Sequence, residues 1–261
     1  MALAISGSPL TFMHIDRLLR GVSEFERVLA AQKKACAPPD FPWYPYGTLS
    51  NFVHLDRLLS GSNRDLASLI EGRPVADVGC ADGDLAFYLE RNGVATIDLI
   101  DYAPTNYNSL RGVRLLATSL GSKVAIHEKD LDSFFAWPSD DYGLTFLLGI
   151  LYHLKNPYYV LESLAKVTRH CLVSTRVARL SGDRSTPIRD QPLAYLLAPD
   201  ECNNDPTNFW IFSERGLRRI LDRTGWDVID YASVGETRKS DPASANADER
   251  AFVLARSRWR G

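Results

Sequence analysis

Apolar side chains in the first 72 positions recur at the three- and four-residue spacing of amphipathic helices. The longest such stretch covers residues 14–35, and shorter ones cover 49–60 and 64–72. One face of the longest stretch collects Ile15, Leu18, Leu19, Val22, Phe25, Val28 and Leu29. The pattern predicts a helical N-terminal extension, or cap, over residues 1–71.

From residue 72 to residue 261, short apolar runs rich in β-branched residues alternate with helical patterns. We predict strands at 74–79, 94–101, 123–130, 142–149, 171–178, 226–233 and 250–257, and helices at 83–93, 107–121, 156–170 and 213–225. This alternation is typical of an α/β fold, in which a mostly parallel, Rossmann-like sheet carries helices on both faces. Ligands of such sheets bind beyond the carboxyl ends of the strands. The long segment at about 180–212 is predicted to overhang that edge as a lid.

Composition narrows the class of protein. The 261 residues are 45% apolar, which is enough for one large core, and the formal net charge is only −2. That charge gives no general reason to expect nucleic acid. The four cysteines form no CxxC pair, so we expect neither a metal site nor a disulfide framework, and a reducing cytoplasm fits best. No apolar run is long enough to cross a membrane, and the N-terminus lacks the pattern of a signal peptide.

The sequence VADVGCADGDL forms the end of the first predicted strand and the start of a helix. Gly79 and Gly83 allow a sharp bend there, with Ala81 between them. The spacing differs from the dinucleotide pattern G-x-G-x-x-G, and Asp82 and Asp84 at the helix start would repel a phosphate. A cationic ligand without phosphate therefore fits better, and a tight turn with no ligand is the alternative.

Two further acids follow the next two predicted strands. Asp101 ends the second strand, where a carboxylate can accept hydrogen bonds from both hydroxyls of a ribose. Asp130 ends the third strand, and its neighbour Leu131 could face an adenine ring. A nucleoside that carries an amino acid and a sulfonium but no phosphate is S-adenosylmethionine.

The motifs VADVGCADG, IDLIDYAP, EKDLDSF and YGLTFLLGILYHL, in this order, resemble those of the class I S-adenosylmethionine-dependent methyltransferases. The resemblance covers roughly residue 72 to the C-terminus. It implies that Asp77, Gly79 and Gly83 hold the methionine end of the cofactor, Asp101 the ribose, and Asp130 and Leu131 the adenine. Leu148 and Gly149 would lie along the cofactor, and the remaining predicted cofactor contacts are Cys80, Ala81 and Tyr102.

Two later segments, LGILYHLKNPYYVLESL and NFWIFSERGLRRILDRTGWDV, resemble the bacterial tRNA wobble-uridine carboxymethyltransferases. In that group a lysine, a tyrosine and an arginine grip the extra carboxylate of carboxy-S-adenosylmethionine. Tyr152 matches the tyrosine and Arg250 the arginine, but the segment PWYPYG, where the lysine should fall, has no basic residue. We therefore predict ordinary S-adenosylmethionine as the cofactor.

Tyr152 and His153 follow the fourth predicted strand, at the expected edge of the active site. His153 is the candidate base for an O- or N-methyl transfer. Its alternative role is to cap the helix that begins near Asn156. The ring of Tyr152 is expected to face the cofactor or to pack.

The lid segment contains NNDPTNFW, and the chain lacks the [DNS]PP[YFW] loop of exocyclic-amine methylases. The predicted substrate-reading residues are Asn203, Asn204, Asp205, Asn208, Trp210 and Arg250. Amides that read hydroxyls beside a stacking tryptophan suit a small polar or sugar-like acceptor, whereas a turn-rich loop is the alternative. Two other functions stay open: modification of tRNA through the arginines at 176–189 and 215–223, and a non-catalytic cofactor-binding scaffold. The sequence does not predict the oligomeric state.

Overall fold

The computed structural model describes residues 13–260. The expectation that the chain lacks a signal peptide rests largely on residues 1–12, which lie outside the described residues, as does the start of the predicted extension.

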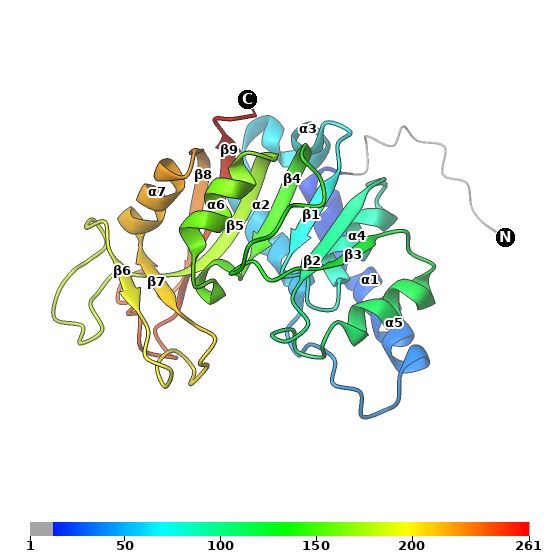
Figure 1. The fold of residues 1–261 in the computed structure, drawn as a ribbon, viewed down its shortest axis with the longest axis horizontal. Helices are drawn as coiled ribbons and strands as arrows, with labels where there is room; N and C mark the ends of the chain where they lie inside the picture. The colour runs from blue at the N-terminus through cyan, green and yellow to red at the C-terminus, as the bar shows by residue number, and fades with distance from the viewer. Residues whose placement is uncertain (1–12, 261) are drawn as a thin grey trace.

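Within residues 13–260, nine strands form one sheet (Figure 1). Five parallel strands run in the order β3-β2-β1-β4-β5; β9 then pairs antiparallel with β5, and β8 pairs antiparallel with β9. The strands are β1 (Val75–Val78), β2 (Ile97–Asp101), β3 (Ala125–Glu128), β4 (Tyr142–Leu148), β5 (Thr168–Ala178), β6 (Ala194–Leu196), β7 (Trp210–Ser213), β8 (Trp226–Gly235) and β9 (Glu249–Ser257). The predicted α/β fold with a mostly parallel sheet is confirmed.

Helices cover both faces of this sheet, as the sequence predicts. The α-helices are α1 (Ile15–Cys36), α2 (Asn51–Leu58), α3 (Leu66–Ile70), α4 (Asp84–Arg91), α5 (Arg111–Leu120), α6 (Pro157–Ala165) and α7 (Glu214–Arg223), and the 3-10 helices are η2 (Thr48–Ser50), η3 (Gly61–Arg64) and η4 (Leu151–His153). Helices α1 to α5 share one hydrophobic core, and α6 and α7 share a second one (Figure 1). Strand β9 shows the alternation that separates these cores, because Phe252 and Leu254 enter the first and Ala251 and Val253 the second.

The N-terminal helices are tied directly to the glycine turn after β1. The Tyr88 hydroxyl of α4 donates to the Leu18 carbonyl at 2.5 Å, and the Lys33 ammonium of α1 lies 3.0 Å from the Asp84 carboxylate. The buried Asp82 carboxylate accepts a hydrogen bond from the Tyr44 backbone at 2.8 Å. Asp82 and Asp84 therefore hold the extension against the turn. A domain boundary at residues 71/72 stays a prediction.

Some element bounds differ from the prediction for local reasons. The helix predicted at 107–121 begins only at Arg111, because the side-chain oxygens of Asn106 and Asn108 accept from the backbone N–H groups of Leu110 and Gly112. The segment predicted as a lid contains the antiparallel pair β6–β7, and β7 pairs with the last two residues of β5. We call β6, β7 and the loop between them the ribbon. No helix within residues 13–260 is both long and apolar enough to cross a membrane.

Candidate active site

A cavity of about 1030 Å³ opens at the carboxyl ends of β1, β2, β4 and β5. The ribbon and the segment from Tyr44 to His54 contribute to its walls. Most of the predicted site residues line it, namely Gly79, Ala81, Asp101, Tyr102, Asp130, Leu131, Leu148, Gly149, Tyr152, His153, Asn203, Asp205, Asn208 and Arg250. The strand ends thus bring together residues from five of the motifs singled out in the sequence.

Five predicted site residues lie outside the lining of this cavity: Asp77, Cys80, Gly83, Asn204 and Trp210. The Trp210 indole donates to the Lys155 carbonyl at 3.2 Å, and its ring packs against the core beneath α6 and α7. The structure therefore does not place Trp210 as the stacking wall that the sequence suggested, because alternation along β7 turns this ring away from the cavity. Asn204 is exposed in the ribbon loop.

The glycine turn owes its shape to three residues with left-handed backbone angles, Gly79 (φ 74°), Ala81 (φ 52°) and Gly83 (φ 82°). A side chain at Gly79 would collide with Ile150, so this position also requires glycine for close packing. The Ala81 N–H donates to the Asp101 carboxylate at 3.0 Å, which fixes the turn against the end of β2. Alanine is accepted at the middle position of the motif because this hydrogen bond supports its strained backbone.

Asp101 is the centre of a hydrogen-bond network at the cavity wall. Its Oδ2 accepts from the Ala81 N–H and from the Asn106 amide, both at 3.0 Å, and its Oδ1 accepts from the Tyr102 N–H at 2.7 Å. Burial raises the pKa of Asp101, whereas these hydrogen bonds oppose that rise. Because Oδ1 has only one partner, it can accept a further hydrogen bond from a ligand.

Asp77 lies just before the glycine turn, and its surroundings indicate whether a cationic cofactor fits the site. It is buried, and among the described residues its Oδ2 has no hydrogen-bond partner. Burial and the nearby Asp101 and Asp84 carboxylates raise the pKa of Asp77 to about 7. A positive ligand would favour the ionised carboxylate by charge attraction, so the residues present fit a cofactor with ammonium and sulfonium groups.

Tyr152 and Arg250 form a pair beside Gly149, where β4 ends. The Arg250 Nη2 lies 3.5 Å from the Tyr152 hydroxyl, and its guanidinium lies 5.6 Å from the centre of the Tyr152 ring. A Cβ on Gly149 would lie 3.3 Å from Arg250 Nη1 and 3.8 Å from the Tyr152 hydroxyl. Tyr44 lines the same cavity, and burial, as the largest cause, raises its pKa to about 12. At neutral pH this corner therefore places the Arg250 guanidinium and the Tyr152 hydroxyl in the same cavity as the neutral phenol of Tyr44.

His153 reaches the cavity from η4. Its Nδ1 lies 3.1 Å from the Thr207 carbonyl oxygen and 3.1 Å from the Thr207 hydroxyl. Because a carbonyl only accepts, this contact favours the tautomer with the proton on Nδ1 and leaves Nε2 free to accept one. Burial lowers the pKa of His153, so the ring is neutral at pH 7. The cap of α6 is made by Asn156, whose side chain accepts from the Tyr159 N–H, so the alternative role for His153 is not needed.

Some polar side chains of the ribbon loop form hydrogen bonds within the loop itself. Asp205 accepts from the Thr207 N–H at 2.9 Å and from its hydroxyl at 2.6 Å, and the Asn208 amide donates to the Cys202 carbonyl at 2.9 Å. Asn203 lines the cavity with a left-handed backbone. Among the described residues, Asn208 Oδ1 has no partner although the residue is only 5% exposed. Asn208 is therefore the loop amide with hydrogen-bonding capacity to spare.

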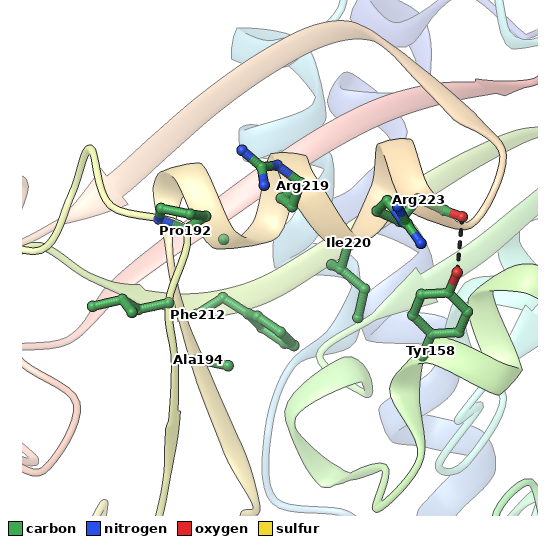
Figure 2. Close-up of a pocket in the computed structure, with 9 residues that line it drawn as sticks. Tyr158, Pro192, Ala194, Phe212, Arg219, Ile220 and Arg223 are labelled. Atoms are coloured by element: carbon green, nitrogen blue, oxygen red, sulfur yellow. Dashed lines mark hydrogen bonds between the residues drawn. The ribbon is translucent and has the colours of Figure 1, made fainter.

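The arginines at the carboxyl end of β5 and in the segment that follows it form ion pairs with acidic residues. The ion pairs are Arg176–Asp248, Arg179–Glu249, Arg184–Asp241 and Arg189–Glu214. On α7, Arg219 and Arg223 line an open hollow of about 240 Å³ between this helix and the ribbon (Figure 2). This hollow shares no lining residue with the large cavity. It is therefore not a candidate for the active site.

Sequence reasoning missed several residues that line the cavity. They include Tyr44, Tyr46, Asn51, His54, Asn106, Lys129, Lys155, Ser174, Arg176, Thr207 and Asp248. The aromatic cluster FPWYPYG was a visible signal for the two tyrosines. His54 and Arg176 carried no such signal, because a single histidine on a helix and an arginine in a strand are each ordinary. Within residues 13–260, no group of three or more His, Cys, Asp or Glu side chains is arranged to hold a metal ion.

Comparison with known proteins identifies similarity to methyltransferases. A family model described as a methyltransferase domain matches residues 54–231, which is more than half of the chain. The tRNA U34 carboxymethyltransferase of Helicobacter pylori (strain HPAG1) is 26% identical over 204 residues, covering 73% of this chain and 68% of that protein. The N-terminal domain of EvdMO1, solved with SAH bound, has a TM-score of 0.55 at 16% identity and covers 97% of this chain and 100% of that one. The cyclase SpnF has a TM-score of 0.58 at 16% identity, covering 90% of this chain and 93% of that one, so likeness at this level identifies the fold alone.

Proposed function

The chain belongs to the methyltransferase-domain family, and from this premise we propose that it transfers the methyl group of S-adenosylmethionine to an oxygen or nitrogen of a small polar or sugar-like acceptor. The observation that carries the proposal is the single cavity in which the Asp101 network and His153 both stand. SAH is bound in the EvdMO1 domain, which supports the same cofactor here. The test is whether purified protein transfers label from labelled S-adenosylmethionine to compounds of a cell extract.

The residues that line or adjoin the cavity have different proposed roles in binding and in methyl transfer. When bound, S-adenosylmethionine supplies an electrophilic methyl group on a sulfonium. Asp101 binds the ribose, and the charge of Asp77 favours the positive end. Tyr152 and Arg250 stand at the end of β4, between the Asp101 side of the cavity and the ribbon. His153 Nε2 accepts the proton that the acceptor loses, and the ribbon excludes water from that step.

We expect Asp101→Ala to weaken the binding of S-adenosylhomocysteine by about 1–2 kcal/mol, because hydrogen bonds to a charged acceptor are lost. Isothermal titration calorimetry measures this directly. Asp200→Ala, an exposed acid of the ribbon loop, is the matched control and should bind like the wild type. Unchanged affinity in the Asp101 variant would rule out its contact with the ribose.

The cofactor is expected to be the ordinary one. Tyr152 and Arg250 could meet an added carboxylate, but residues 43–47 supply a neutral tyrosine, Tyr44, where a lysine would complete the site. Competition calorimetry should show that S-adenosylmethionine binds at least as tightly as its carboxylated form. A preference for the carboxylated form on the order of a hundredfold, about 2.7 kcal/mol, would contradict this and favour carboxymethylation of tRNA.

Modification of tRNA is the second candidate function, and the Helicobacter relative is the observation that favours it. The ion pairs of Arg176, Arg179, Arg184 and Arg189 count against a phosphate-binding surface at the end of β5. Strong binding of tRNA that weakens steeply with salt would support this candidate. Absence of binding at low salt would remove it.

A further inference from the structure

The cavity has a second end, between α2, the carboxyl end of β5 and the start of β9. In the register of these strands Arg176 lies opposite Arg250, and Ser174 lies opposite Phe252. Side chains opposite one another, or two residues apart, share one face of an antiparallel pair. Ser174, Arg176 and Arg250 therefore project from the same face, and all three line the cavity.

Helix α2 places His54 over this face. The His54 ring lies 4.7 Å from the ring of Phe252, centre to centre, and the residue lines the cavity. Among the described residues no partner hydrogen-bonds to either ring nitrogen, and Nδ1 is buried. Burial, Arg57 and Arg250 lower the pKa of His54, so the imidazole is neutral at pH 7. The nitrogen left to meet a ligand is Nε2.

The opposite wall comes from the ribbon. Arg176 Nη1 lies 2.6 Å from Cys202 Sγ, and the Cys202 carbonyl accepts from the Asn208 amide. These contacts bring Asn208, with its unpartnered Oδ1, next to Arg176. Polar side chains from α2, from β5 and from the ribbon thus surround this end of the cavity, and a polar ligand suits such walls.

We propose that this end of the cavity, lined by His54, Ser174, Arg176, Asn208 and Arg250, is the acceptor chamber, and that it binds a compound with vicinal hydroxyl groups. The inference rests on the proposed function and names its substrate class. Polar donors and acceptors make up these walls, as a polyhydroxylated ligand requires. His54 acts as a positioning residue that hydrogen-bonds one hydroxyl, while proton removal remains with His153.

His54→Phe tests the chamber, because phenylalanine keeps the stack on Phe252 but removes both nitrogens. Acceptor activity is measured with labelled S-adenosylmethionine and dilutions of the low-molecular-weight fraction of a cell extract. We expect the amount of extract for half-maximal transfer to rise about tenfold, with the maximal rate and S-adenosylhomocysteine affinity little changed. Val53→Ala, at an exposed neighbour on α2, is the control and should behave like the wild type.

Two further measurements separate this inference from the proposed function. Periodate cleaves vicinal diols, so extract treated with periodate and then quenched should lose its acceptor activity. Retained activity after that treatment, or wild-type half-saturation in His54→Phe, would overturn the chamber while leaving methyl transfer intact. If the wild type labels nothing in untreated extract, the proposed function fails instead. In that case the melting temperature of His54→Phe still tests the role of His54. Removing an unpaired buried nitrogen should leave the melting temperature unchanged or raise it. A clear drop would show that His54 is a structural residue.

Discussion

Glu249→Ala is expected to destabilise the protein by about 3–5 kcal/mol, because it leaves a largely buried arginine without its partner. Glu249 is 1% exposed, and its carboxylate accepts from Arg179 Nε at 2.8 Å and from Arg179 Nη2 at 2.7 Å. The Ser240 hydroxyl adds a third hydrogen bond at 2.7 Å. This network joins the end of β5 to the start of β9, next to Arg250. Urea unfolding of the variant measures the loss.

The matched control is Glu24→Ala. Glu24 lies 3.4 Å from Arg91 on the surface, and both side chains are at least half exposed, so its removal should cost about 0–1 kcal/mol. If the two variants lose similarly little stability, the Arg179–Glu249 pair does not hold the strand ends together. Loss of cofactor affinity in Glu249→Ala under conditions where the protein remains folded would show that the pair also positions Arg250.

His153→Asn is expected to lower the turnover number by about 10²–10⁴, which is the usual contribution of a positioned general base. Cofactor affinity should remain, because His153 lies on the ribbon side of the cavity. In the wild type, turnover should fall as the pH decreases through the pKa of His153, which burial holds below its ordinary value of 6.5. The neutral base is present above that pKa and lost below it, so the acid limb should disappear in the variant.

His14→Asn serves as the control for this experiment. His14 is the N-cap of α1, and asparagine is a good N-cap residue. It lies outside the cavity lining, so its replacement should leave both turnover and the acid limb unchanged. Wild-type turnover in His153→Asn would exclude the base role and would make the contact with Thr207 purely structural.

Much of this arrangement could be predicted because it depends on local sequence. The parallel strands β1, β2 and β4 are buried on both faces and therefore appear as short apolar runs. Gly79 and Asp101 mark the ends of two of them, and parallel strands end at one edge of a sheet. The location of the cavity at the strand ends followed from these positions.

Other features depend on contacts between distant segments. Strand β7 is stabilised by pairing with the end of β5, which no local pattern in the ribbon announces. Arg176 belongs to the arginines considered for tRNA contact, yet it is buried against Asp248 and Cys202. Trp210 follows polar loop residues, but in β7 its partly buried ring packs against the core. In each case, contacts between distant segments determine the pairing of a strand or the direction of a side chain.

A crystal structure of the protein grown with S-adenosylhomocysteine tests the central claim most directly. The account predicts that the ligand lies in the large cavity, with its ribose hydroxyls on Asp101 Oδ1, its amino group on the side of Asp77, and its sulfur directed toward Tyr152 and the ribbon. A ligand bound elsewhere, or bound in this cavity with its ribose away from Asp101, would contradict the account.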